Sequence, residues 1–262
     1  MDWLQVVILA LIQGITEFLP ISSSGHLVLP AQLSSWPDQG LAFDVGVHFG
    51  TLMAVVVYFR HTLTDMFLSV SQWPMQRVYD DNLDWVLKLG LATLPVAIIG
   101  FLAKDFIEAN LRTIPTIAAT TIIFALALWW ADRKPGYNEV ISWAGAAFIG
   151  AAQVLALIPG TSRSGITITA ALLLGLSRHT SARFSFLLSI PTIAGAQLLL
   201  TQDLMEQSST QPWGELIAGA VISGIAAYTC IHFFITLVER TGMLPYVIYR
   251  LILGVGLLLF LM

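Results

Sequence analysis

The chain has 262 residues, of which 56% are hydrophobic and only 11% are charged, and its formal net charge is −4. Soluble domains carry about 25% charged residues, so this chain has too few polar side chains to cover a water-facing surface. A soluble enzyme and a disordered chain are therefore excluded, and the acidic balance excludes a nucleic-acid partner. The mean hydropathy of +0.80 leaves a polytopic membrane protein as the class that fits.

The chain begins with an apolar stretch, 3–12, that is interrupted by Glu17, Pro20 and a Ser-Ser-Ser-Gly-His run at 22–26. A helix needs about 20 apolar residues to cross the hydrocarbon core of a membrane. Broken backbone at membrane depth is tolerated only where it is buried in protein or lines a cavity. We therefore expect this region to form a re-entrant hairpin rather than a full span.

Six later stretches are apolar over a length that can span a membrane: 41–59, 84–103, 114–131, 184–201, 214–238 and 244–262. A second interrupted region lies between the third and fourth of these. Its apolar part, 141–158, is followed by Pro-Gly-Thr-Ser-Arg-Ser-Gly at 159–165 and by a short apolar run, 166–176. The sequence thus predicts an all-α polytopic membrane protein, folded as a single domain over 1–262, with two broken-helix hairpins and six full spans.

The two interrupted regions match each other at a constant offset. Gln13 and Gln153 are 140 positions apart, and residues 22–25 align with 162–165 at the same offset. Each half would contain one hairpin and three spans, and because three is odd the second half enters the membrane inverted. We interpret the chain as two inverted-topology repeats, 1–131 and 135–262. Matching Gly/Pro-interrupted segments in two halves indicate a binding site near the membrane midplane.

The basic residues predict an orientation. If the N-terminus faces outward, the inner loops contain seven Lys or Arg residues, which are Arg60, Arg77, Arg133, Lys134, Arg178, Arg183 and Arg240. The outer loops then contain two, Lys104 and Arg112. Cytoplasmic loops are enriched in Lys and Arg, so both termini are predicted to be periplasmic. Lys88 and Arg250 lie in apolar segments near span ends, and we expect their side chains to extend to water.

Arg163 is the strongest candidate for chemistry, because its Ser- and Gly-rich turn opens the apolar run 166–176. If that run is a helix, its N-terminal N–H groups form a ready anion site. The guanidinium adds two parallel donors for phosphate oxygens. The hydroxyls of Ser162, Ser164 and Thr167 add further donors. The pattern favours a diphosphate-binding turn over the alternative of an arginine that extends to the membrane interface.

The first hairpin places Glu17, Ser23 and His26 within ten residues. The carboxylate suits a general acid or base or a cation ligand, the hydroxyl suits a nucleophile, and the imidazole suits either attack or activation. The alternative is that the carboxylate and serines cap helices. A phosphorylated substrate beside Glu17 requires intervening positive charge, so we expect a bound divalent cation, Mg²⁺ or Ca²⁺, an arginine, or both.

Asp44 and His48 lie four residues apart on the first full span and therefore share a helical face. Two interpretations stay open for this pair. Both side chains line the same cavity as the hairpins, or they pair with each other inside the helix bundle.

Both interrupted regions resemble the signatures of one known family. The run from Gln13 to His26 is similar to the first signature of the bacterial undecaprenyl-diphosphate phosphatases of the bacitracin-resistance type, and 159–165 is similar to the second. The similarity extends over the whole chain, including Tyr249-Arg250. The resemblance implies an inner-membrane hydrolase that converts undecaprenyl diphosphate to undecaprenyl phosphate and inorganic phosphate. That reaction recycles the lipid carrier for peptidoglycan synthesis and so serves cell wall biogenesis, cell shape and bacitracin resistance.

The resemblance also implies a divalent cation and a site that opens toward the periplasm. Carried over by motif, Glu17 is the metal or acid–base carboxylate, and Ser23 and His26 occupy nucleophile or activating positions. The residues that match the family's diphosphate-binding turn are Ser162, Arg163 and Thr167. Many members have a glutamate where this chain has Gln13. This departure weakens a scheme with two carboxylates on one cation, and it leaves Glu17 as the main metal ligand with the Gln13 amide as an additional, uncharged one.

The expected partners are a polyprenyl diphosphate substrate and membrane lipid, with no nucleic acid, and assembly as a homodimer is left open. Inverted repeats with broken helices are also a transporter design, so a flippase of undecaprenyl phosphate is the alternative function. A pure transporter needs Arg163 but not the pair of Glu17 and His26. A long polyprenyl tail must enter from the lipid, so we expect a lateral opening between spans.

Overall fold

The computed structural model describes residues 1–33, 36–111, 113–133, 136–206 and 213–260. Arg112 and Lys134, which were used above to predict the orientation, lie outside these described residues. The helices are α1 (Trp3–Thr16), α2 (Ser23–Leu33), α3 (Gly40–Tyr58), α4 (Arg60–Gln76), α5 (Asp81–Asn110), α6 (Ile114–Asp132), α7 (Trp143–Gln153), α8 (Arg163–Leu173), α9 (Arg178–Glu206), α10 (Trp213–Thr241) and α11 (Leu244–Phe260), with a short 3₁₀ helix at Val154–Leu157. The described residues form no β-strand beyond one isolated bridge, so the all-α prediction is confirmed for them.

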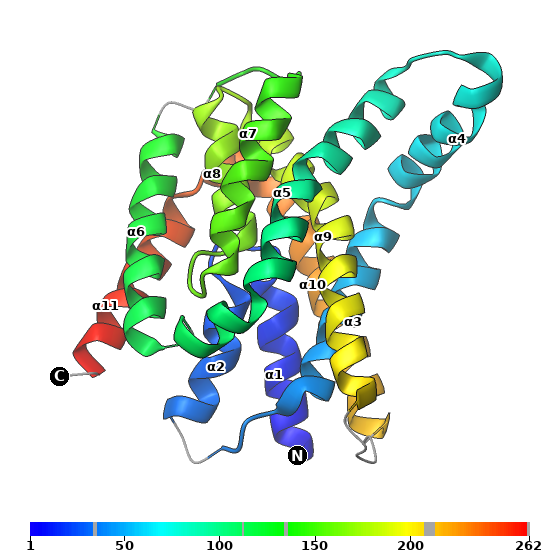
Figure 1. Cartoon of the computed structure of the whole chain (residues 1–262). Helices are drawn as coiled ribbons and strands as arrows, with labels where there is room; N and C mark the ends of the chain where they lie inside the picture. Colours follow the sequence, from blue (N-terminus) through cyan, green and yellow to red (C-terminus); the bar gives the residue numbers. More distant parts are fainter. Residues whose placement is uncertain (34–35, 112, 134–135, 207–212, 261–262) are drawn as a thin grey trace.

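Five of these helices are long and apolar enough to cross a membrane: α3, α5 over Asp81–Ala103, α6, α9 over Arg178–Gln202, and α10. The expected sixth span corresponds to α11, which has 17 residues, so the count of six stays a prediction. The outer surface is apolar, since Phe101, Ile225 and Ile252 are each exposed by 65% or more. Figure 1 shows both ends of the chain toward the lower side of the bundle and α4 projecting at its upper side.

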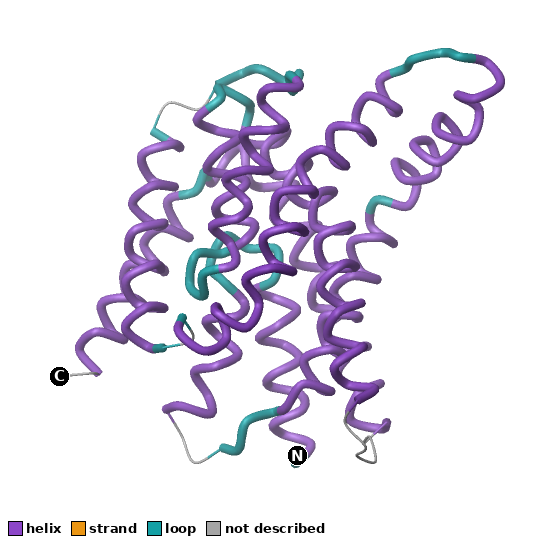
Figure 2. The backbone as a smooth tube through the Cα atoms, viewed as in Figure 1, coloured by secondary structure: helices purple, strands orange, loops and turns teal. Residues whose placement is uncertain are grey.

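Helices α1 and α2 form the first hairpin, and α7 and α8 form the second. Asp2 caps α1 by accepting from the Gln5 backbone N–H, and Ser142 caps α7 in the same way. Each hairpin is broken where a serine has a positive φ, 75° at Ser22 and 71° at Ser162. Residues other than glycine rarely adopt such a φ, so neither serine is helical, and α2 and α8 begin at the next residue. Figure 2 shows the two turns at mid-height of the bundle, surrounded by helices.

Each hairpin packs one face against a long helix, while Leu11 and Ile15 on the other face of α1 are 39% and 46% exposed. Helix α1 packs on α10, and α7 packs on α5. Gly14 permits the first contact, because a Cβ there would lie 2.5 Å from the Ser223 carbonyl oxygen. In the second hairpin Thr167 and Ile168 are fully buried. The broken backbone is therefore enclosed by protein, as its unpaired polar groups require.

The expectation that Lys88 and Arg250 extend to water is wrong. Lys88 is 6% exposed, pairs with Asp84 and lies 5.6 Å from the centre of the Trp143 ring. Arg250 is fully buried and donates to backbone carbonyls. A buried cation is tolerated when protein groups replace its hydration, and both side chains meet that condition.

Candidate active site

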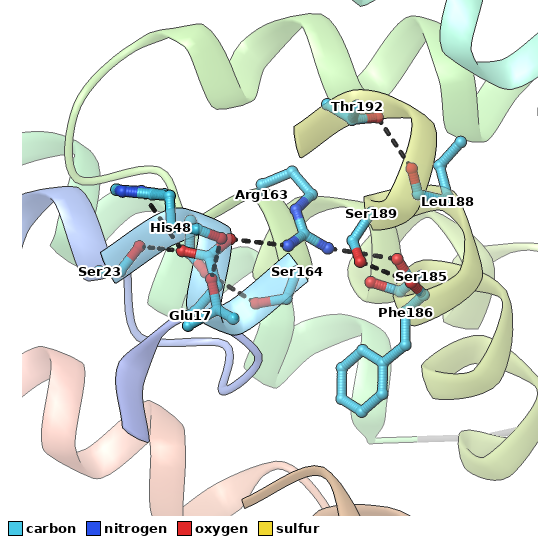
Figure 3. A network of polar contacts seen from close by, with 12 residues as sticks. Glu17, Ser23, His48, Arg163, Ser164, Ser185, Phe186, Leu188, Ser189 and Thr192 are labelled. Atoms are coloured by element: carbon cyan, nitrogen blue, oxygen red, sulfur yellow. Dashed lines mark hydrogen bonds and ion pairs between the residues drawn. The ribbon is translucent and has the colours of Figure 1, made fainter. Parts of the chain in front are cut away.

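The turns of the two hairpins meet at an ion pair. Glu17 follows α1 directly, and Arg163 is the first residue of α8. Arg163 Nη2 donates to Glu17 Oε1 across 2.9 Å, with the two side chains 13% and 8% exposed (Figure 3). The fold thus brings together the carboxylate of one motif and the guanidinium of the other.

Glu17 Oε2 accepts from the other residues of the first hairpin. Ser23 Oγ donates to it across 2.6 Å, and Gln13 Nε2 donates across 3.0 Å. His48 Nε2 lies 3.9 Å away on α3. A hydroxyl that donates to a carboxylate at this distance is placed to lose its proton to it. Ser23 is therefore the hydroxyl that the site can activate through Glu17.

His48 presents one ring nitrogen to Glu17 (Figure 3). Its Nδ1 lies 2.8 Å from the Asp44 backbone oxygen, and because a carbonyl only accepts, Nδ1 is the protonated nitrogen. Asp44 itself accepts from Gln39 Nε2 across 3.0 Å. Of the two residues left open by the sequence, His48 lines the cavity described below and Asp44 does not.

His26 is turned away from Glu17. Its Nδ1 lies 2.7 Å from the Ser22 carbonyl oxygen, and its Nε2 lies 2.6 Å from Tyr249 Oη. The first contact requires a proton on Nδ1, so Nε2 accepts from the tyrosine. The two rings stack with their centres 5.5 Å apart. The role of His26 as nucleophile or activator stays a prediction; in this structure it joins α2 to α11.

The residues predicted for the diphosphate turn divide into two groups. Ser162 and Arg163 line the cavity, and Ser162 Oγ also accepts from the Gly165 N–H across 3.1 Å. Ser164 Oγ donates to the Leu19 carbonyl across 2.8 Å and so ties the two turns together. Thr167 is fully buried, with its Oγ1 2.7 Å from Ser185 Oγ on α9. The last two hydroxyls lie behind the cavity wall.

Helix α9 contributes to the site although no residue of that span was predicted to do so. The Ser185 carbonyl accepts from Arg163 Nη1 across 3.3 Å, and Thr192 and Gln197 line the cavity. Gln197 Nε2 donates to the Val45 carbonyl on α3 across 3.0 Å. The sequence does contain an indication of this role, because these polar side chains interrupt an otherwise apolar span. A polar residue buried in such a span often faces an interior cavity.

The cavity has a volume of about 250 Å³. Its polar wall is formed by Glu17, Ser22, Ser23, Ser24, His48, Ser162 and Arg163. A second cavity of about 420 Å³ adjoins it between α5 and α9, and its wall is almost entirely apolar. Both are lined by Val96, Leu157, Thr192, Ala196 and Leu200. Phe101 and Leu198 border the second cavity and are 67% and 64% exposed, so it reaches the outer surface of the bundle.

The donor set limits how a cation could bind. Among the described residues no group of three His, Cys, Asp or Glu side chains could hold a metal ion. Glu17 already accepts from three side chains. Gln13 Oε1, however, is buried and has no donor among the described residues, so it is an acceptor available to a cation. This set fits a cation that shares its ligands with substrate phosphates, as Mg²⁺ commonly does, better than a cation held by protein alone.

Comparisons with known proteins identify the family to which this sequence is similar. A family model described as bacitracin resistance protein BacA matches residues 6–256. The undecaprenyl-diphosphatase of Alcanivorax borkumensis is 57% identical over 265 residues, which cover 100% of both chains. Both matches include the two hairpins and the helices that enclose them.

Proposed function

This chain belongs to the bacitracin resistance protein BacA family, and we propose that it hydrolyses undecaprenyl diphosphate to undecaprenyl phosphate and inorganic phosphate. The observation that carries the proposal is the series of contacts from Ser23 through Glu17 to Arg163 on the wall of one cavity. The chain is a multi-pass membrane protein, which fits a lipid substrate. Family membership does not favour the alternative of a flippase.

In the proposed reaction, the terminal phosphate lies against Arg163 and the N-terminus of α8. The guanidinium offers two donors to phosphate oxygens, and the helix end adds its N–H groups. Ser23 Oγ loses its proton to Glu17 and bonds to the terminal phosphorus, while the anhydride bond breaks and undecaprenyl phosphate leaves with the bonding electrons. Water then attacks the phosphoserine, inorganic phosphate leaves, and the proton returns to Ser23.

We propose that Glu17, together with Gln13 Oε1, holds the divalent cation, Mg²⁺ or Ca²⁺. When bound, such a cation supplies positive charge that offsets the negative charge of the diphosphate. The buried acceptor on Gln13 supports this placement. Arg163 supplies the remaining positive charge from the opposite hairpin.

The polyprenyl tail is proposed to lie in the apolar cavity between α5 and α9. That cavity adjoins the polar one and is bordered by exposed apolar side chains, which supports its assignment as the expected lateral opening. A diphosphate can therefore reach Arg163 while its tail stays among apolar side chains. Burial of apolar surface of the tail would add binding energy for the whole substrate.

We further propose that the halves are inverted repeats and that the site opens to the periplasm. Helix α1 packs on the second span of the other half, α10, and α7 packs on the second span of the first half, α5, a reciprocal exchange that a two-fold relation requires. The positive φ values at Ser22 and Ser162 support the same relation. The proposed orientation, with periplasmic termini and an inner-membrane location, rests on the excess of basic residues in the loops assigned to the cytoplasm.

The experiment is phosphate release from undecaprenyl diphosphate by the purified protein in detergent, with Mg²⁺, Ca²⁺ or EDTA. We expect cation-dependent release that is abolished by Glu17→Ala and Arg163→Ala. Ser23→Ala is expected to be far less active than the matched Ser24→Ala, because Ser24 Oγ contacts Ser22 Oγ rather than Glu17. Absence of release from folded wild-type protein would overturn the proposal.

A further inference from the structure

Arg250 contacts both broken turns with one side chain. Its Nη1 donates to the Pro20 carbonyl across 3.1 Å, and its Nη2 donates to the Gly160 and Thr161 carbonyls, each across 2.9 Å. Its Nε donates to the Thr121 carbonyl on α6 across 3.2 Å. Pro20 is three residues after Glu17, and Thr161 is two residues before Arg163. The guanidinium therefore joins the two segments that carry the ion pair.

The surroundings of Arg250 are unusual for a buried cation. The side chain is fully buried, and among the described residues no carboxylate lies within ion-pairing distance of it. Three of its partners are carbonyls of the two turns, which have no helical donor to satisfy them, and the fourth is the Thr121 carbonyl within α6. Four carbonyls and one guanidinium thus satisfy each other. Loss of the guanidinium would leave carbonyls of both turns buried without donors.

Arg250 is not placed to bind the substrate. It does not line the polar cavity, and four of its five N–H donors are directed at backbone carbonyls. Gly165 makes room for it, since a Cβ at that position would lie 2.8 Å from Arg250 Nη1. The preceding residue, Tyr249, contacts His26 at the start of α2. Helix α11 therefore holds the first hairpin at two adjacent positions.

We propose that Arg250 is a positioning residue, which fixes the two turns relative to each other and thereby sets the contact between Glu17 and Arg163. The kinetic part of this inference rests on the phosphatase function proposed above. The structural part does not. The structural part requires only that both turns become less rigidly held when the guanidinium is removed.

The first test is Arg250→Lys, which keeps the positive charge but replaces a planar fork by a single ammonium that cannot reach all three elements. We expect kcat for undecaprenyl diphosphate to fall about 10- to 100-fold with little change in KM, because a misplacement of about 1 Å has that effect. The matched control is Arg178→Lys. Arg178 also bridges helices, through Asp132 and the Glu239 carbonyl, but lies outside both cavities. It is expected to lower thermal stability without a comparable fall in kcat of the folded protein.

The second test does not depend on activity. Hydrogen exchange measured by mass spectrometry is expected to be faster in Arg250→Lys than in the wild type over both 18–24 and 158–164. In the control, Arg178→Lys, exchange is expected to be unchanged in both segments. Unchanged exchange in either turn, or wild-type kcat in folded Arg250→Lys, would overturn the inference. If Arg250→Lys does not fold, Gly165→Ala displaces the retained guanidinium but also brings a Cβ to 3.1 Å from Ser162 Oγ, so the deciding result is then faster exchange in the other turn, 18–24. If wild-type protein releases no phosphate, the proposed function fails while the exchange result still decides this inference.

Discussion

Arg163 Nη2 and Glu17 Oε1 lie 2.9 Å apart although the two residues are 146 positions apart in the chain. Glu17 is the C-cap of α1, where its N–H still donates to the Gln13 carbonyl, and Arg163 is the first residue of α8, so both side chains lie at helix ends beside the two turns. Both side chains are mostly buried, and the distance between the two charged groups depends on how the two turns pack against each other. A diphosphate that binds Arg163 must compete with Glu17, and this competition would free the carboxylate for Ser23.

The pair can be tested by a double-mutant cycle on thermal stability in detergent. Arg163→Gln leaves a buried carboxylate without its cation, and removal of one partner of a buried pair costs about 3–5 kcal/mol. Glu17→Gln/Arg163→Gln removes both charges and is expected to be more stable than Arg163→Gln alone. All of these variants are expected to be inactive. If the effects of the single substitutions simply add, the two charges do not interact in the folded protein.

The contact between His26 and Tyr249 separates a positioning role from a chemical role for the histidine. If His26 acts only through the bond that Tyr249 Oη donates to its Nε2, then His26→Gln and Tyr249→Phe should lower kcat by similar, modest factors. Loss of one such hydrogen bond costs about 1 kcal/mol, or roughly a factor of five. Steady-state kinetics of both variants provide the measurement. A much larger loss in His26→Gln would assign the histidine to the chemistry.

His48 offers the complementary test. Its Nε2 faces Glu17 from α3 and borders the polar cavity. A group so placed is expected to take part in proton transfer, for which the loss is typically about 10²-fold or more. We therefore expect His48→Ala to lower kcat more than Tyr249→Phe does. Equal activity of His48→Ala and the wild type would show that this side chain only fills the cavity wall.

The residue pattern predicted the helices, the two broken hairpins and the placement of Glu17 and Arg163 beside the turns, because a charged residue in an apolar segment is visible in the sequence. It did not predict the position of Arg250. A basic residue near the end of an apolar stretch commonly extends to water, and the alternative requires carbonyls from two distant turns. Nor did it separate His26 from His48, since ring direction depends on acceptors such as the Ser22 and Asp44 carbonyls.

Gln13 provides a test of the cation. Gln13→Glu would place a second carboxylate next to Glu17, where Gln13 Nε2 now donates to Oε2. Two carboxylates repel unless a cation lies between them, so the Mg²⁺ concentration for half-maximal activity is expected to fall roughly tenfold or more. Gln153→Glu is the matched control. Gln153 is buried at the corresponding place of the other hairpin but bonds to the Ala92 carbonyl and Thr192. A cation requirement that changes equally in both variants would contradict this placement.

The apolar cavity between α5 and α9 can be filled without disturbing the fold. Gly195 lines it, and a Cβ built there meets no atom within 4 Å. Gly195→Phe is expected to raise KM for undecaprenyl diphosphate roughly tenfold and to affect farnesyl diphosphate much less, because the ring blocks the path of the longer tail. Gly256→Phe is the control, since Gly256 has equally open surroundings but lies on α11 outside the cavity. Equal effects of Gly195→Phe on both substrates would place the tail elsewhere, whereas an effect confined to the long substrate would establish the path from the lipid to Arg163.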